Sequence, residues 1–145
     1  MADKKSKKEK RLKKSEYESL SEFRYAIRKF LSFSEAAAEA VGLTSQQHQA
    51  LLAIKGFAER EKITNGELAE RLQIKHHSAV GLLNRLESQN LIRREPSDRD
   101  RREIYVALTA RGEELLEQLT AVHQKELQHI APQLAGILKN LKRVN

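Results

Sequence analysis

Residues 63–112 decide the fold, and they have the sequence ITNGELAERLQIKHHSAVGLLNRLESQNLIRREPSDRDRREIYVALTARG. Thr64 and Glu67 have the spacing of a capping box, in which two side chains three residues apart satisfy each other's free backbone donors at a helix start. Residues 68–72 keep the apolar spacing of a short helix, and 73–75 form a tight turn. The first part of this stretch therefore predicts a helix and a turn.

A second helix is expected at 76–89, where the side chains divide into two faces at about 100° per residue. One face is apolar and consists of Ala79, Val80, Leu82, Leu83 and Leu86. The opposite face is polar or small and consists of His77, Ser78, Gly81, Asn84, Arg85 and Ser88. His76 points toward the apolar half, where local bonding and a contact with a partner are equally reasonable roles. Asn90 can end this helix in the left-handed conformation.

Two strand-like runs follow at 91–94 and 103–108, and the second alternates in polarity. The polar connection 95–102 contains Pro96 and several arginines. A connection of this length and composition predicts an extended hairpin that projects from the body of the domain.

Helices are also expected before this stretch. Ser15 and Glu18 have capping-box spacing and would begin a long helix that stops at Gly42, which favours a left-handed conformation. Thr44 and Gln47 have the same spacing at the start of the next helix.

Two more helices are expected after the hairpin, one capped by Thr109 and one opened by Pro132. The predicted order is α-α-α-α-β-β-α-α. The fold class is therefore mainly α with a small β hairpin.

A helix, a turn, a helix with a polar face and an arginine-tipped hairpin occur in this order in a winged helix-turn-helix. The segment 63–112 resembles the DNA-binding core of the MarR family of bacterial and archaeal transcription regulators. The most diagnostic match is Asp100-Arg101-Arg102, followed by alternating residues up to Leu108-Thr109 and by Gly112. Gln73 stands where many helix-turn-helix proteins have glycine, and Lys75 stands where a small capping residue is usual in this family.

The resemblance covers residues 15–145 and implies a MarR-type domain. It places a winged helix-turn-helix at about 44–112 and dimerisation helices at about 15–41 and 110–142. Residues 1–14 lie outside it, and we expect them to form a basic, disordered tail.

Charge clusters in two places along the 145 residues, whose formal net charge is +7. Residues 1–14 carry eight lysines and arginines against Asp3 and Glu9, and 75–102 carry seven bases against four acids. Such clusters indicate a polyanion-binding protein, although a basic tail alone also serves solubility. The sequence has no cysteine, no secretory signal and no apolar stretch of about 20 residues. We therefore expect a cytoplasmic protein without disulfides, thiolate metal sites or membrane contact.

On the second helix of the motif, His77, Ser78 and Asn84 can meet base edges in the major groove, and Arg85 can hold a phosphate. Lys75 opposes the helix macrodipole unless a phosphate lies nearby, which makes a phosphate contact reasonable. A merely solvated polar face is the alternative.

In the hairpin, the resemblance implies that Asp100 orients Arg102 toward the narrow minor groove and that Arg99 and Arg101 lie near the backbone. The negative potential of that groove favours a guanidinium. A solvated charged turn is the alternative for these residues.

The resemblance also implies a homodimeric repressor, released from an inverted-repeat operator by a small molecule bound between the dimer helices and the winged domain. Aromatic or acyl anions are the expected effectors. The candidate side chains for the ring and its carboxylate are Arg24, Tyr25, Arg28, Phe30, Phe33 and His48. Aromatic residues at this spacing also form ordinary cores.

Two other classes of protein remain open from the sequence. His123, Glu126 and His129 could bind a metal in an enzyme, but their directions spread over about 120° and they lack the spacing that aligns two histidines four apart. Because no nucleophile–base motif or phosphate loop occurs, we expect neither catalysis nor a cofactor. The lysine tail would also suit a non-specific architectural DNA protein.

Overall fold

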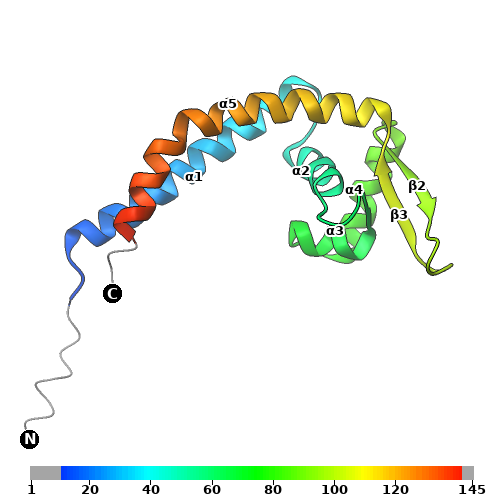
Figure 1. The fold of residues 1–145 in the computed structure, drawn as a ribbon, viewed down its shortest axis with the longest axis horizontal. Helices are drawn as coiled ribbons and strands as arrows, with labels where there is room; N and C mark the ends of the chain where they lie inside the picture. Colours follow the sequence, from blue (N-terminus) through cyan, green and yellow to red (C-terminus); the bar gives the residue numbers. More distant parts are fainter. Residues whose placement is uncertain (1–10, 142–145) are drawn as a thin grey trace, which may run out of the picture. The chain divides into compact units, whose positions relative to one another are not determined.

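The structure is a computed structural model that describes residues 11–141, so most of the basic tail, residues 1–10, lies outside the described residues. The described chain contains five helices and three strands (Figure 1). Their order and bounds are α1 Lys14–Ala40, α2 Ser45–Lys55, β1 Lys62–Thr64, α3 Asn65–Leu72, α4 His76–Ser88, β2 Ile92–Pro96, β3 Ile104–Leu108 and α5 Ala110–Leu141. The predicted fold class, mainly helical with a small hairpin, is confirmed.

Two compact units divide the chain. Phe33–Lys125 form one unit, which contains α2 to α4 and the sheet, and we call it the winged unit. The described parts of Met1–Ser32 and Glu126–Asn145 form the other, which we call the helical unit. None of the described helices is both long and apolar enough to cross a bilayer.

Helix starts follow the predicted capping boxes at two of three positions. Thr44 with Gln47 and Thr64 with Glu67 form both reciprocal bonds. The box predicted at Ser15 is wrong, because α1 begins one residue earlier and the Lys13 N–H donates to the Glu16 carboxylate at 2.9 Å. Here the carboxylate of the first turn satisfies a free donor without a hydroxyl partner.

Pro132 lies inside α5, so the predicted sixth helix is wrong. Proline in a helix interior removes one bond to the carbonyl four residues earlier. That carbonyl belongs to Gln128, which is exposed, so water can replace the missing N–H. The helix therefore continues through the proline.

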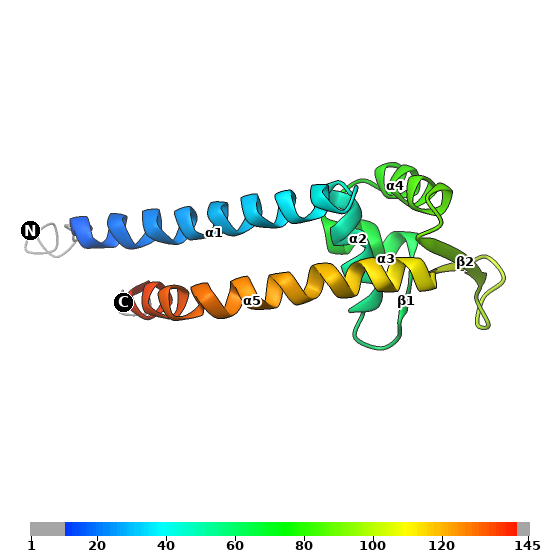
Figure 2. The same cartoon turned by 90° about the horizontal axis from the view of Figure 1, so that it is seen from above.

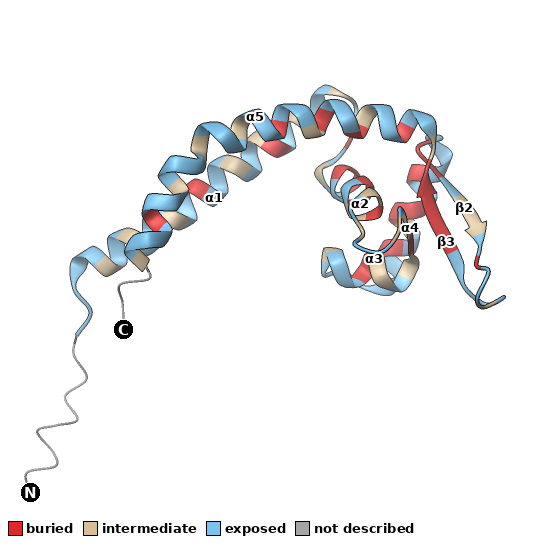
Figure 3. Ribbon diagram, in the orientation of Figure 1, coloured by how far each residue is buried: buried red, intermediate tan, exposed pale blue. Residues whose placement is uncertain are grey.

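The sheet is antiparallel in the order β1-β3-β2. β2 and β3 form the predicted hairpin, with Arg94 opposite Val106, and the loop 97–103 extends beyond the paired strands (Figure 2). β1 was not predicted, because three residues are too short to show alternation. It pairs Ile63 with Val106 and makes β3 the central strand, which explains why β3 is almost wholly buried (Figure 3).

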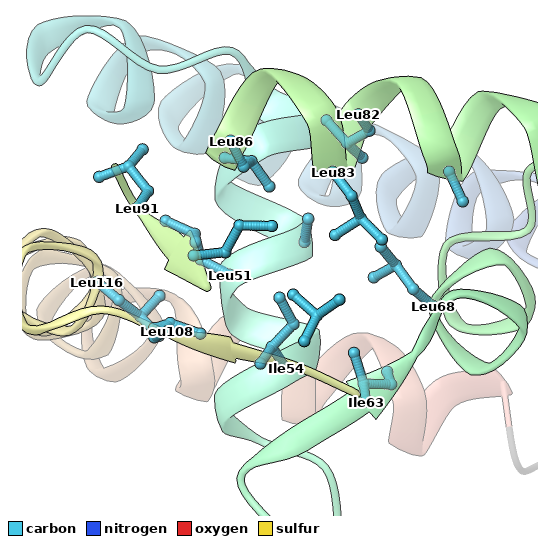
Figure 4. Close-up of a cluster of buried hydrophobic side chains, with 14 of the residues drawn as sticks. Leu51, Ile54, Ile63, Leu68, Leu82, Leu83, Leu86, Leu91, Leu108 and Leu116 are labelled. Carbon is cyan, nitrogen blue, oxygen red and sulfur yellow. The ribbon is translucent and has the colours of Figure 1, made fainter. Parts of the chain in front are cut away.

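Side chains from α2, α3, α4, α5 and the sheet meet in one core inside the winged unit (Figure 4). Its largest fully buried members include Leu51, Ile54, Ile63, Leu68, Leu83 and Leu86. Four of the five apolar residues predicted for the buried face of α4 are buried, but Val80 is exposed. Val80 lies about 100° from the centre of the buried stripe, at the edge of the polar face.

Candidate nucleic-acid interface

The turn between α3 and α4 sets the direction of α4. Gln73 ends α3 in the left-handed conformation (φ 55°, ψ 46°), which glycine adopts most readily. Its own side chain helps to hold it there, because Nε2 donates to the Glu70 carbonyl at 2.7 Å. The departure from glycine at this position therefore leaves the turn geometry intact.

The first turn of α4 is held from α3. Asn65 Nδ2 lies 3.0 Å from the His76 ring and 3.4 Å from the His76 carbonyl oxygen. His76 thus makes a bond within the unit, and its predicted contact with a partner stays a prediction. Lys75 precedes it at the N-cap position and makes no side-chain capping bond.

The outer face of α4 presents the predicted contact residues His77, Ser78, Asn84 and Arg85, all of them exposed. Within residues 11–141, Lys75 and Arg85 form no ion pair, whereas the arginines at the base of the hairpin do. The positive charges of Lys75 and Arg85 are therefore available to an external anion.

Arg94 ties the hairpin to α4. Its Nη2 donates to Asn84 Oδ1 at 2.9 Å, and its Nη1 lies 2.6 Å from Glu87 Oε1. The bond uses the amide oxygen of Asn84 and leaves the two N–H donors of Nδ2 for other acceptors. The hairpin and the helix are thus connected on the same side of the unit.

The tip of the hairpin is organised by Ser97, which is buried. Its hydroxyl oxygen accepts from the backbone N–H groups of Arg99 (3.1 Å) and Asp100 (3.3 Å), and its own N–H donates to the Glu103 carbonyl at 3.2 Å. A serine that bonds to N–H groups two and three residues later is typical of a local turn.

Asp100 and Arg102 form the pair that the resemblance implied. Asp100 Oδ1 accepts from the Arg102 backbone N–H at 2.9 Å and lies 3.5 Å from Arg102 Nε. The Arg102 side chain is still 92% exposed. The Asp100 carboxylate therefore holds the backbone of Arg102 in place, while the guanidinium end of the side chain stays in solvent.

The other wing arginines differ from one another. Arg99 Nη2 donates to the Tyr105 hydroxyl at 3.0 Å, and this hydrogen bond holds the pKa of Tyr105 below its ordinary value. Arg101 is exposed and forms no ion pair with any described residue. Two of the three wing arginines, Arg101 and Arg102, thus present their side chains outward.

Three residues of this surface were not assigned a role from the sequence: Ser97, Arg94 and Tyr105. Ser97 directly follows Pro96 in a polar run, which is a signal for a local turn. Arg94 and Tyr105 make their bonds to residues of other elements or across the hairpin loop. Such contacts depend on the strand register and cannot be recognised from a local sequence pattern.

The candidate effector residues divide between the two units. Arg24, Tyr25 and Arg28 lie on the exposed surface of α1 in the helical unit. Phe30 lines a small cavity of about 170 Å³ in that unit, beside Lys29 and His129.

Phe33 and His48 lie in the winged unit, where both contact His123. The Phe33 ring meets it edge-on at 5.4 Å between centroids, and His48 lies at 4.8 Å. His123 Nδ1 lies 2.6 Å from the Leu119 carbonyl oxygen and must donate to it, and Nε2 lies 2.8 Å from Ser34 Oγ. Both ring nitrogens of His123 therefore have a hydrogen-bond partner within the winged unit. Among residues 11–141, no group of three side chains that could hold a metal ion occurs.

His48 itself is 4% exposed, and its Nδ1 is buried without a hydrogen-bond partner in the described chain. Burial, together with the neighbouring His123, lowers the pKa of His48. The neutral ring is therefore the form that the folded winged unit accommodates.

The known proteins to which this chain is similar are transcription regulators. Residues 41–103 match the model of the MarR family. "Transcriptional activatory protein BadR" of Rhodopseudomonas palustris is 29% identical over 122 residues, which cover 75% of this chain and 70% of that protein.

Solved structures show the same fold. MepR, a transcription regulator of the Staphylococcus aureus multidrug efflux pump MepA, is 23% identical with a TM-score of 0.72, over 85% of this chain and 96% of that one. A MepR–DNA complex from S. aureus is 25% identical with a TM-score of 0.65, over 77% and 81%. A mutant of MarR from E. coli is 25% identical with a TM-score of 0.65, over 83% and 91%.

The buried His48 generates a prediction about stability and pH. Below about pH 6.5, the ordinary pKa of a histidine, the unfolded chain takes up a proton that the folded chain resists. Stability should therefore fall as pH falls from 7.5 to 5.5, and His48→Leu should reduce this loss. Urea unfolding at both pH values measures it. His77→Gln, at an exposed site, is the control and should keep the loss of the parent; an equal loss in His48→Leu would contradict the assignment.

Proposed function

We propose that the chain, whose residues 41–103 match the model of the MarR family, is a transcription regulator of that family that binds double-stranded DNA at specific sites as a homodimer and represses transcription there. The observation that carries this proposal is the joint placement of the polar face of α4 and the arginine tip of the hairpin, tied to each other by Arg94. The same similarity argues against a metal-dependent enzyme, because the relative from R. palustris bears the name of a transcriptional activatory protein.

In the proposed complex, α4 lies in the major groove, whose width admits one helix. His77, Ser78 and Asn84 contact base edges, while Lys75 and Arg85 contact phosphates. The absence of ion pairs for these two cations within residues 11–141 supports phosphate contacts, since neither must break an internal pair first.

The hairpin would place Arg102 in the adjacent minor groove, with Arg99 and Arg101 near the backbone. The long exposed side chain of Arg102 suits this role, because a guanidinium must reach past the sugar edges to enter a narrow groove. The solved complex of MepR with DNA supports DNA as the partner.

Dimerisation is supported by apolar residues that the helical unit leaves uncovered. Tyr17, Leu20, Ile27 and Leu31 are 38% to 62% exposed and recur at helical spacing along one stripe of α1. Leu127 and Leu138 of α5 are similarly exposed. Two-fold symmetry would give each dimer two copies of α4, which matches an inverted-repeat operator with half-sites about one DNA turn apart.

Activation is the second candidate for the direction of regulation, because the relative from R. palustris bears the name of an activatory protein. The two outcomes depend on where the operator lies relative to the promoter. A reporter under the control of the bound site distinguishes them, since deletion of the regulator raises expression for a repressor and lowers it for an activator.

A non-specific architectural protein would differ in binding, not in fold. Phosphate contacts alone carry no sequence information, so such a protein would bind promoter and random DNA with similar affinity. Outside the tail, net positive charge is confined to residues 75–102, where seven bases stand against four acids, while the other residues together carry more acids than bases. This concentration favours the site-specific proposal.

We expect Arg102→Ala to weaken operator binding strongly, and Asn84→Ala to lose about 1 to 3 kcal/mol of discrimination at one base pair in each half-site. Fluorescence anisotropy with operator and single-base variants measures both effects. Glu87→Gln loosens Arg94 without touching the proposed base contact, so it is the control for Asn84→Ala. Arg111→Ala on α5 is the control for charge. Parent-like discrimination by Asn84→Ala would remove Asn84 from the proposed contacts.

The dimer should depend on the α1 stripe. Leu20→Lys combined with Leu31→Lys places two charges on one face of the helix and should yield monomers that bind operator weakly, as measured by light scattering and anisotropy. Leu52→Lys alters a similarly exposed leucine of α2 in the winged unit and should remain dimeric. A parent protein that scatters as a monomer at micromolar concentration would contradict the proposal.

Release by a small aromatic or acyl anion is the regulatory part of the proposal. A ligand shifts the DNA-bound population only if it binds the DNA-incompetent state more tightly. Aryl carboxylates and their coenzyme A thioesters should therefore include a compound that dissociates labelled operator. Arg24→Ala should reduce its effect, whereas Lys125→Ala should not. If no compound shifts the complex, the protein is a constitutive DNA binder.

A further inference from the structure

One aliphatic side chain borders the polar face of α4. Val80 is 37% exposed, whereas the other apolar residues of the helix, Ala79, Leu82, Leu83 and Leu86, are at most 1% exposed. His77 lies three residues before it and Asn84 four residues after it, so these side chains are neighbours on the helix surface. The core of the winged unit thus leaves Val80 exposed between two polar side chains.

Gly81 follows directly, and nothing in the described chain requires a glycine there. A Cβ at this position would meet only the far end of the Arg85 side chain, at 3.7 Å, which is an ordinary contact with a flexible group. Its φ is not positive, unlike that of Gly42. Gly112 is different, because a Cβ there would clash with the Leu91 carbonyl. Glycine in a helix interior is destabilising relative to alanine, so Gly81 carries a cost with no compensation inside residues 11–141.

We propose that Val80 packs against the C5-methyl group of a thymine in the major groove and that Gly81 allows the backbone of α4 to approach the base pairs closely. This inference rests on the proposed DNA binding and adds a specificity contact to it. Thymine is the base that presents an apolar group in the major groove. The exposed Val80, which lies between two polar side chains, can pack against this methyl group. Because Gly81 has no Cβ, the α4 backbone can come close enough to the base pairs for Val80 to reach it.

The position of Val80 sets a rule for the operator. Asn84 lies one helical turn further along the same face, so the thymine under Val80 lies close to the base pair that Asn84 contacts. Each half-site should therefore contain a thymine whose methyl group contributes to affinity. The matching contact in the second half-site follows from two-fold symmetry.

The test begins with selection of operator sequences from random duplexes by the full-length protein. Each thymine of the selected half-site is then replaced in turn by deoxyuridine, which removes only the C5-methyl group. At one position the replacement should weaken binding by about fourfold, as expected for one buried methyl group. Val80→Ala should bind parent operator more weakly and should be insensitive to uracil at that position, and Val80→Ile should remain sensitive.

Gly81 is tested by opposite changes in stability and binding. Gly81→Ala should raise Tm by about 2–4 °C and should weaken operator binding at least tenfold. Gly66→Ala on α3, where a Cβ meets nothing within 4 Å, is the control and should leave affinity unchanged. Loss of binding in a more stable protein cannot arise from a damaged fold.

Three results would overturn the inference. If selection yields no preferred sequence, site-specific binding fails and the inference fails with it. If a sequence is selected but Val80→Ala responds to every uracil as the parent does, only the thymine contact is wrong. If Gly81→Ala binds as tightly as the parent, close approach of the α4 backbone is wrong.

Discussion

The Arg94 guanidinium connects α4 with the hairpin, the two elements proposed to contact DNA. It starts from β2 and bonds to Asn84 and Glu87 on successive turns of α4. A half-exposed ion pair of this kind adds at most about 1 kcal/mol to stability, so its main effect is positional. Contacts in adjacent grooves would require a fixed distance between α4 and the hairpin. The bonds of Arg94 to Asn84 and Glu87 help to fix this distance at the exposed side of the two elements.

The core makes that constraint possible. Leu86 of α4, Leu91 before β2 and Leu108 of β3 lie in one cluster with Leu51 of α2 (Figure 4). Because α4 and the hairpin both pack against this cluster, neither can move far without opening a cavity in the core. The polar residues on the outer face of α4 are therefore free of packing requirements, and so are Val80, which is exposed, and Gly81, where a Cβ would meet only the end of the Arg85 side chain.

Much of this arrangement was predictable because its signals are local. The capping boxes at Thr44 and Thr64, the polar face of α4 and the Asp100–Arg102 pair all depend on residues within one or two turns. The helix start predicted at Pro132 is wrong: proline favours the first turn of a helix, but here it lies inside α5, and Gln128, whose carbonyl loses its N–H partner, is exposed. The contact of His48 with His123 joins residues 75 positions apart, and the Arg94 bridge depends on strand register. Such contacts follow from packing and have no local pattern in the sequence.

Chemical footprinting of the selected operator tests the joint docking of helix and hairpin most directly. Methylation of guanine N7 reports the major groove, and hydroxyl-radical cleavage reports the minor groove. The account predicts two blocks of methylation interference about one DNA turn apart, each with a protected stretch of minor groove next to it. In Arg102→Ala the minor-groove protection should disappear while the interference blocks remain. Uniform protection along the duplex, without interference at any guanine, would contradict the account.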